Sequence, residues 1–200
     1  MELQLASKSP RRRELLDQIG VRYRTVSVNV PELREHSEAP HAYVNRLALS
    51  KAEAGAKAYP GLPTLGSDTI VVCDGEVLEK PANFDDFTRM MSMLSACSHS
   101  VITAIAICIA DERGCLLSDW TRTDSSATEV CFRTLSDTEI AEYWQTGEPQ
   151  DKAGGYAIQG LAATFVKEIH GSYSGVVGLP IETLVPLLND HGIKVWNRHL

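Results

Sequence analysis

The hydrophobic and polar positions of this 200-residue chain follow two periods in turn, which predicts strands interleaved with helices. Apolar runs or period-two alternation predict strands over residues 2–6, 21–30, 64–73, 76–79, 99–110, about 126–133 and 165–169. Apolar stripes at helical spacing predict helices over residues 9–20, 41–58, 83–94, 136–147 and 180–188. The order predicts an α/β fold in which helices flank a mixed, twisted sheet. The length favours a single domain over residues 1–200, with room for two lobes.

Local signals mark several boundaries of these elements. Ser9 is a helix-capping residue, Pro10 suits a first helical turn, and Gly20 is a typical helix end. The segment 136–139 reads Ser-Asp-Thr-Glu, the pattern of a capping box. Asp-Gly at 74–75, between alternating apolar runs, predicts a tight two-residue hairpin.

The charge of the chain narrows the choice of partner. There are 26 acidic and 19 basic side chains, a net charge of −7, which argues against a general nucleic-acid or membrane-surface binder. Residues 1–24 nevertheless carry six basic side chains against three acidic ones, a local charge of +3. A small basic patch on an acidic protein favours a small anion as its ligand.

Cysteine usage and hydropathy suggest a compartment. The five cysteines, at 73, 97, 108, 115 and 131, are odd in number and form no CxxC pair, so they indicate neither a disulfide framework nor a zinc site. We expect buried free thiols in a reducing cytosol. The first residues lack the apolar core of a signal peptide, and no apolar run has the length of a membrane span. The expected location is the cytoplasm.

The first candidate site is the segment 7–13, Ser-Lys-Ser-Pro-Arg-Arg-Arg, where a predicted strand meets a helix N-terminus. That end of a helix offers unpaired N–H groups and favours an anion. Arginines are unfavourable there unless they serve a ligand, and their guanidinium groups match phosphate oxygens. The alternative is a solvated face with surface ion pairs. The chain has no P-loop, GxGxxG, GxSxG or HExxH motif.

The second candidate is Lys51, which shares the apolar face of the predicted helix 41–58 with Val44, Leu47 and Ala48. Its ammonium group could extend sideways to solvent, which is the more common outcome, or point at a ligand over the sheet.

The third candidate is the hairpin 66–81. Continued pairing beyond its turn would set Ile70 opposite Glu79 and make Asp68 a diagonal neighbour of Glu79, roughly 7–8 Å away. Lys80 would emerge at the same end. Two carboxylates there could hold Mg²⁺ or orient a water, and the lysine could neutralise phosphate. The alternative is an ion cluster at the end of a strand.

The fourth candidate is the segment 151–160, DKAGGYAIQG. Its paired glycines permit close backbone approach, and Gln159 carries the donor and acceptor that suit a base edge. Taken alone, the segment favours a plain turn.

Together these segments resemble the Maf family of nucleoside triphosphate pyrophosphatases. LASKSPRRRELL, LALSKA around Lys51, GSDTIVVCDGEVLEKP, DKAGGYAIQG and GSYSGVVGLPIETL occur in the family's order over nearly the whole chain. The resemblance implies two lobes about a deep cleft, a fold related to inosine triphosphate pyrophosphatases. It also implies hydrolysis between the α and β phosphates with a divalent cation, magnesium or manganese.

The resemblance also implies roles for individual residues. Asp68 matches the proton acceptor that activates water, and Glu32 matches an acidic position that handles metal or water with it, in a neighbourhood that departs from the commoner pattern. The hairpin spacing, rather than the resemblance, adds Glu79 as a candidate metal ligand beside Asp68. The implied substrate contacts are Ser7, Arg11, Arg12, Lys51, Thr69, Lys80 and Gln159. Among these, Arg11, Thr69 and Gln159 resemble the branch that hydrolyses dTTP and UTP, and whether modified uridine triphosphates are also substrates stays open at this point.

Two other functions stay open at this point. One is the 7-methyl-GTP branch of the same family, and the other is a non-catalytic nucleotide-binding regulator of septum formation. The resemblance further implies a homodimer, whereas the expectation of no nucleic-acid or membrane partner comes from the charge and hydropathy of the chain.

Overall fold

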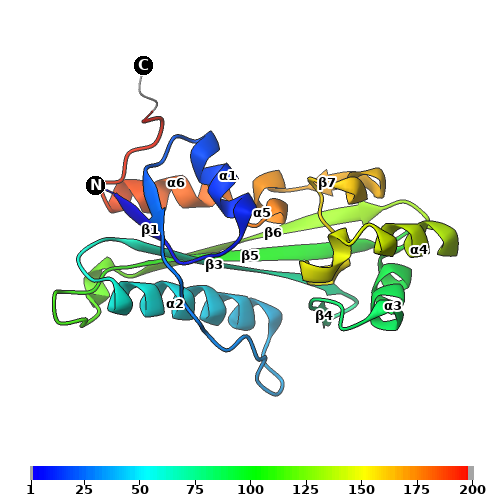
Figure 1. The fold of residues 1–200 in the computed structure, drawn as a ribbon, viewed down its shortest axis with the longest axis horizontal. Coiled ribbons are helices and arrows are strands. Elements are labelled where there is room, and N and C mark those ends of the chain that lie inside the picture. Colours follow the sequence, from blue (N-terminus) through cyan, green and yellow to red (C-terminus); the bar gives the residue numbers. More distant parts are fainter. Residues whose placement is uncertain (1, 198–200) are drawn as a thin grey trace. The chain divides into compact units, whose positions relative to one another are not determined.

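A computed structural model describes residues 2–197, which form one mixed sheet and its flanking helices (Figure 1). The strands are β1 (Leu3–Leu5), β2 (Tyr23–Thr25), β3 (Thr64–Cys73), β4 (Glu76–Leu78), β5 (Ser98–Cys108), β6 (Arg122–Phe132) and β7 (Val166–His170). The α-helices are α1 (Pro10–Gln18), α2 (Pro40–Ala58), α3 (Phe84–Leu94), α4 (Asp137–Gln145), α5 (Tyr173–Val177) and α6 (Ile181–Asp190). Short 3₁₀ turns occupy Ser118–Trp120, Glu148–Asp151, Ala153–Gly155 and Leu161–Thr164.

The strands follow the order β2-β1-β3-β5-β6-β7, with β4 paired to β3. β1 runs parallel to both β2 and β3, whereas β4 is antiparallel to β3 and β7 is antiparallel to β6. The sheet is therefore mixed, and the predicted α/β class is confirmed. Among the described helices, none has both the length and the apolar character needed to cross a lipid bilayer.

The chain divides into two compact units. Unit 1 contains the residues up to Asp68, Thr103–Ser126 and the residues from Gly178 on, and unit 2 contains Thr69–Ile102 and Ala127–Val177. In unit 1, α2 buries an apolar face that includes Val44, Leu47 and Ala48. In unit 2, aromatic rings join α3 to α4, since the Phe87 and Trp144 ring centroids lie 5.0 Å apart.

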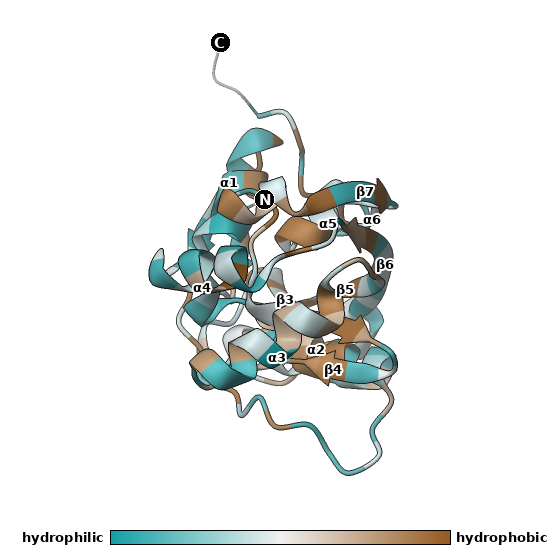
Figure 2. Cartoon of the chain, turned by 90° about the vertical axis from the view of Figure 1, so that its right-hand side faces the viewer, coloured by the Kyte–Doolittle hydropathy of each residue, from teal (hydrophilic) through white to brown (hydrophobic). Residues whose placement is uncertain are grey.

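The exposed sides of the short helices are polar. In Figure 2 the α1 and α4 ribbons are largely hydrophilic, and each helix buries only two residues, Leu15 and Leu16 in α1 and Ile140 and Tyr143 in α4. In each helix these two residues mark the face that packs against the rest of its unit.

Most predicted elements and turns are confirmed. The capping box at Ser136 is present, with its side chain and that of Glu139 each bonded to the other's backbone N–H. At the predicted hairpin, Asp74 and Gly75 have φ of 49° and 79°, as a tight turn of this kind requires. The ladder then pairs Cys73 with Glu76, as expected.

Two expectations need correction, and one helix was not expected. The predicted strand 21–30 is only Tyr23–Thr25, because β2 pairs with β1 and β1 itself ends at Leu5. The β3–β4 ladder ends at Leu78, so the expected pairing of Ile70 with Glu79 is not part of it. Helix α5, in the glycine-rich segment, was not predicted.

The cysteines match the expectation in part. All five are free thiols, as predicted. Cys73 and Cys108 are buried, whereas Cys97 and Cys131 are half-buried and Cys115 is exposed. The exposed position follows from its place in the loop that the Ala110–Leu116 bridge closes.

Candidate functional site

In unit 1 the ammonium group of Lys51 joins two carboxylates. Its Nζ lies 2.6 Å from Asp68 Oδ1 and 2.5 Å from Glu32 Oε1. The Lys51 and Asp68 side chains are only 12% and 13% exposed, whereas that of Glu32 is 45% exposed. Lys51 therefore does not extend alone into solvent: it is a nearly buried cation between two anions, open to solvent on the Glu32 side.

A glycine brings the strand that carries Asp68 onto the helix that carries Lys51. A Cβ atom at Gly66 would lie 2.2 Å from the carbonyl oxygen of Ala48 and 2.5 Å from the amide nitrogen of Ala52, both in the backbone of α2. Real Cβ atoms do not approach backbone so closely. The absence of a side chain at residue 66 thus permits the contact of β3 with α2 that sets Asp68 beside Lys51.

The third member of this cluster is held by the same helix. Tyr43 of α2, whose side chain is buried, donates its hydroxyl hydrogen to the Glu32 carbonyl oxygen at 3.0 Å. Arg46, one turn further along α2, binds both carboxylate oxygens of Glu38 at 2.7 Å and donates to the Leu33 carbonyl. Hydrogen bonds from Tyr43 and Arg46 therefore hold the loop that carries Glu32 against α2, both at residues 32–33 and at Glu38.

Arg12 and Ser7 form a second group in unit 1. Arg12 donates through Nε to the Gly178 carbonyl oxygen at 2.8 Å and through Nη1 to Ser7 Oγ at 3.1 Å. Ser67 donates its hydroxyl hydrogen to the same Gly178 carbonyl at 3.1 Å. The Gly178 carbonyl, 166 residues from Arg12 in the sequence, thus accepts hydrogen bonds both from the basic segment and from Ser67, the residue before Asp68 in β3.

The charges of these two groups influence one another. Burial lowers the pKa of Arg12, and the positive charge of Arg11 acts in the same direction. The negative charges of Asp68 and Glu32 oppose that shift. Arg11, Arg12, Lys51, Glu32 and Asp68 therefore share one electrostatic environment.

The first turn of α1 adds to the positive character of this region. The helix begins with Pro10, contains no acidic residue in its first turn, and receives no side-chain cap from Ser9. Its nine residues carry the N-terminal partial positive charge that attracts anions. The Ser7 hydroxyl accepts the Ser9 N–H at 3.2 Å, which makes a local turn immediately before the helix.

In unit 2 the predicted glycine loop lies against the hairpin. Gly154, at φ 66°, donates its N–H to the Glu79 carbonyl oxygen at 3.0 Å, and a Cβ there would lie 2.8 Å from the Val71 side chain. The contact joins the glycine loop to the backbone of Glu79, one residue beyond the end of β4. The expected close backbone approach is confirmed, and the side chains of Glu79 and Lys80 are exposed.

Gln159 lies exposed in the turn that follows this loop. The turn is closed by the Gly160 N–H, which donates to the Ala157 carbonyl at 2.9 Å. The Glu148 carboxylate holds the next residues: it accepts the Leu161 N–H at 3.0 Å, the Ala162 N–H at 3.3 Å and the Tyr143 hydroxyl at 2.8 Å. A Cβ at Gly160 would lie 2.2 Å from a Glu148 oxygen, so this glycine leaves the space that the carboxylate fills.

The sequence-predicted residues therefore fall into two sets. Unit 1 holds Ser7, Arg11, Arg12, Glu32, Lys51 and Asp68, whereas Thr69, Glu79, Lys80 and Gln159 belong to unit 2. Sequence reasoning missed the positioning residues Tyr43, Ser67, Glu148 and Gly178. For Ser67 and Gly178 a signal existed, because both lie inside glycine-rich motifs.

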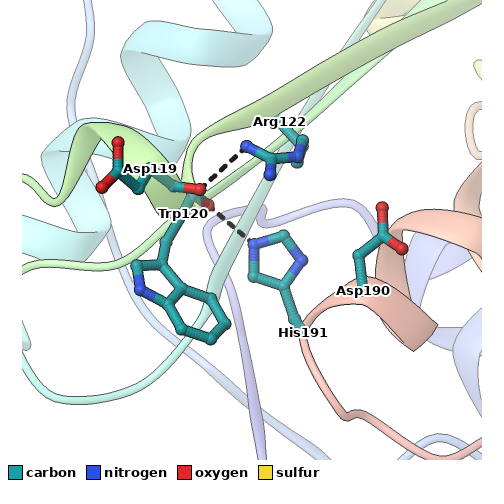
Figure 3. Close-up of a pocket in the computed structure, with 5 residues that line it drawn as sticks. All are labelled: Asp119, Trp120, Arg122, Asp190 and His191. Atoms are coloured by element: carbon teal, nitrogen blue, oxygen red, sulfur yellow. Dashed lines mark hydrogen bonds between the residues drawn. The ribbon is translucent and has the colours of Figure 1, made fainter.

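A separate pocket of unit 1 contains none of these residues. It has a volume of about 310 Å³ and is lined by Asp119, Trp120, Arg122, Asp190 and His191 (Figure 3). His191 Nε2 lies 2.7 Å from the Trp120 carbonyl and Nδ1 lies 2.7 Å from that of Leu187, while Arg122 donates to the Asp119 carbonyl. Its buried histidine thus joins the end of α6 to the turn before β6.

Comparison with known proteins decides the family. The family model described as Maf-like protein matches residues 2–191, nearly the whole chain. This chain belongs to the Maf family. The assignment agrees with the five sequence motifs and with the arrangement of their polar residues.

Curated relatives of this Maf protein share one name. A protein of Saccharophagus degradans named dTTP/UTP pyrophosphatase is 50% identical, over 98% of this chain and 91% of the relative. A protein of the same name from Pseudoalteromonas translucida is 49% identical, over 92% of this chain and 94% of the relative.

A solved structure supports the fold of this Maf protein. A HAM1 protein from Coxiella burnetii aligns with a TM-score of 0.51 and 16% identity, over 95% of this chain and 99% of the other. At that identity the likeness concerns the fold alone.

Proposed function

We propose that this protein is a nucleoside triphosphate pyrophosphatase that hydrolyses dTTP and UTP to the monophosphate and pyrophosphate, a role in control of the nucleotide pool. The names of relatives at 50% and 49% identity support this substrate class. The observation that carries the proposal is the Lys51 ammonium held between Asp68 and Glu32, with Arg12 in the same electrostatic environment.

The positive groups of unit 1 suit a triphosphate chain. A nucleoside triphosphate brings about four negative charges at neutral pH, and phosphoryl chemistry depends mainly on positioning and charge neutralisation. Arg11, Arg12, Lys51 and the N–H groups at the start of α1 supply positive charge. The Ser7 hydroxyl adds a donor beside Arg12.

Asp68 is the group proposed to act on the attacking water. Its carboxylate is fixed through Oδ1 by Lys51 and is nearly buried, so its orientation is defined before substrate binds. A carboxylate so held can orient a water and accept its proton as the oxygen attacks the α-phosphorus. Glu32, more exposed, is a second acceptor on the other side of the same ammonium.

The donor set fits a magnesium or manganese ion. Glu32 and Asp68 already direct carboxylate oxygens to one cation, the Lys51 ammonium, and hard oxygen ligands are those that these metals prefer. Glu79 is a further proposed ligand. When bound, such an ion neutralises phosphate charge and favours ionisation of a coordinated water.

The remaining proposed contacts concern the base and the phosphates. Gln159 carries an amide that donates and accepts, which matches a pyrimidine edge. Thr69 and Arg11 are proposed to select the base together with it, and Lys80 to bind phosphate. These assignments rest on the sequence motifs. We also propose that both units act as one catalytic domain, in a cytoplasmic homodimer.

The test is release of pyrophosphate from a panel of nucleotides that includes dTTP, UTP, modified uridine triphosphates, the common purine triphosphates and 7-methyl-GTP. We expect turnover of dTTP and UTP with little of the others. Preference for 7-methyl-GTP would assign the protein to the other branch of the family. Tight binding without turnover would favour the regulator of septum formation.

The same assay tests the residues. Asp68→Asn is expected to fold and lose most turnover, while Asp74→Asn, at the exposed tip of the β3–β4 hairpin, keeps it. Gln159→Glu is expected to weaken use of UTP, because a carboxylate cannot donate to a base carbonyl. Equal UTP turnover by Gln159→Glu and the unmodified protein would exclude a base-reading role for this residue.

A further inference from the structure

Strands β6 and β7 of unit 2 form a ladder (Figure 1) that carries none of the proposed substrate contacts. A group of side chains that could bind a metal lies on it. It consists of Glu129, Cys131 and His170, whose ligand atoms all lie within 4.8 Å of one another. The three residue types are those that bind zinc in proteins.

Strand geometry explains the grouping. Glu129 and Cys131 are two residues apart on β6, so they point to the same face. The antiparallel register sets Glu129 opposite His170 and Cys131 opposite Glu168, and opposed residues also share a face. The alternate residue Val130 is fully buried on the other face. Four side chains with metal-binding atoms thus form one patch on a rigid ladder.

The surroundings of the patch suit a bound ion. His170 Nε2 lies 3.3 Å from Glu168 Oε1, and a carboxylate on one ring nitrogen is the usual partner of an imidazole whose other nitrogen binds metal. Ser98 Oγ lies 2.8 Å from Cys131 Sγ, so a hydroxyl is available to stabilise a thiolate. Cys131 is half-buried, whereas Glu129 and His170 are exposed.

We propose that Glu129, Cys131 and His170 form a zinc site, with Glu168 orienting the imidazole. Ligand atoms around a tetrahedral zinc lie roughly 3.3–3.8 Å apart, given bond lengths of about 2.0–2.3 Å. The exposed Glu129 and His170 side chains can close the difference by rotation. Binding releases the thiol proton of Cys131 to solvent, and the thiolate and imidazole select zinc over the magnesium expected at carboxylate sites.

The described residues include a competing group, Cys73, Asp74 and Cys97. Burial raises the pKa of the Cys73 thiol to about 11, which disfavours the thiolate that a metal needs. A test must nevertheless distinguish the two groups, because each contains a thiol.

The experiment titrates the full-length protein with Co²⁺, in the presence of excess Mg²⁺ to occupy carboxylate sites, and then displaces Co²⁺ with Zn²⁺. The thiolate-to-cobalt absorption reports a sulfur ligand and is silent for a carboxylate site. We expect one equivalent of Co²⁺ to produce the band and one equivalent of Zn²⁺ to remove it. Cys131→Ser should abolish the band, and His170→Ala should weaken binding at least about 10–100-fold.

The matched controls are Cys97→Ser, in the competing group, and Cys115→Ser, at an exposed thiol outside both groups. Both should keep the band. The proposal is overturned if the unmodified protein gives no band, if Cys131→Ser retains it, if Cys97→Ser loses it, or if His170→Ala binds as tightly as the unmodified protein. His170 is exposed, so its variant tests the site even if Cys131→Ser unfolds.

Discussion

Removing Lys51 should destabilise the protein more than removing either of its partners. In Lys51→Met, two carboxylates that shared one ammonium group face each other without a cation between them. In Asp68→Asn, by contrast, Lys51 keeps its contact with Glu32 at 2.5 Å. The bridging arrangement therefore predicts unequal costs for the two substitutions.

The expected magnitudes follow from exposure. Breaking a buried ion pair by removing one partner costs about 3–5 kcal/mol. Because Glu32 is 45% exposed and Arg12 still acts on Asp68, we expect about 2–3 kcal/mol for Lys51→Met. Asp68→Asn should cost about 1 kcal/mol, as expected for one lost hydrogen bond. The double variant should be more stable than the two costs together imply, with a coupling of about 1–2 kcal/mol.

The assay is urea unfolding of the unmodified protein, the two single variants and the double variant. The control cycle uses Lys57 and Glu53, one helical turn apart on the surface of α2 at 3.6 Å, where about 0.3–0.5 kcal/mol is expected. If the Lys51–Asp68 coupling is no larger than that of the control pair, the ammonium does not hold the carboxylate in place and the reasoning fails.

Three further predictions concern packing, pH and loop position. Gly66→Ala should cost at least about 1–3 kcal/mol in urea unfolding and lower kcat, because its methyl group would lie 2.2 Å from the Ala48 carbonyl and force β3 from α2. Burial lowers the pKa of His99 to about 4 from an ordinary 6.5, so only the unfolded chain binds this proton between those values. The free energy of unfolding should therefore fall by about 3 kcal/mol as pH falls from 6.5 to 4, measured by urea titrations at each pH. Glu148→Gln should raise KM for UTP, since an amide NH₂ replaces one of the two oxygens that accept from the segment that follows Gln159.

A specific result would contradict each of these three predictions. An unchanged urea midpoint for Gly66→Ala would mean that the strand and the helix have room for a methyl group. His99→Gln should make the pH dependence shallower between 6.5 and 4, and an identical slope would assign it to other groups. Glu142→Gln, on the exposed side of α4, is the control for Glu148→Gln, and an equal KM in both would remove Glu148 from the loop's support.

Local signals predicted the fold well because each acts over a few residues. The capping box at Ser136 and the turn at Asp74 and Gly75 depend only on their own chemistry, and both are present. The strand 21–30 was overestimated because strand length depends on a partner, and β1 ends at Leu5. The expected pairing of Ile70 with Glu79 assumed that the ladder continues past Leu78, but the ladder ends there, and the Glu79 carbonyl accepts a hydrogen bond from Gly154, far along the chain.

The candidate site, like the fold, could be predicted from the sequence only in part. Motifs singled out Arg12, Lys51 and Asp68 as candidate site residues, but their spacing could not reveal that Lys51 joins Asp68 to Glu32. That contact depends on packing at Gly66, where residues of α2 and β3 meet without a side chain between them. Links between distant residues of this kind leave no periodic trace in the sequence.

The most direct test of the account is the product analysis of UTP incubated with the unmodified protein and Mg²⁺. Attack by water at the α-phosphorus predicts UMP and pyrophosphate in equal amounts, and near-complete loss of both products in Asp68→Asn. Formation of UDP and inorganic phosphate, or equal turnover by Asp68→Asn, would contradict it.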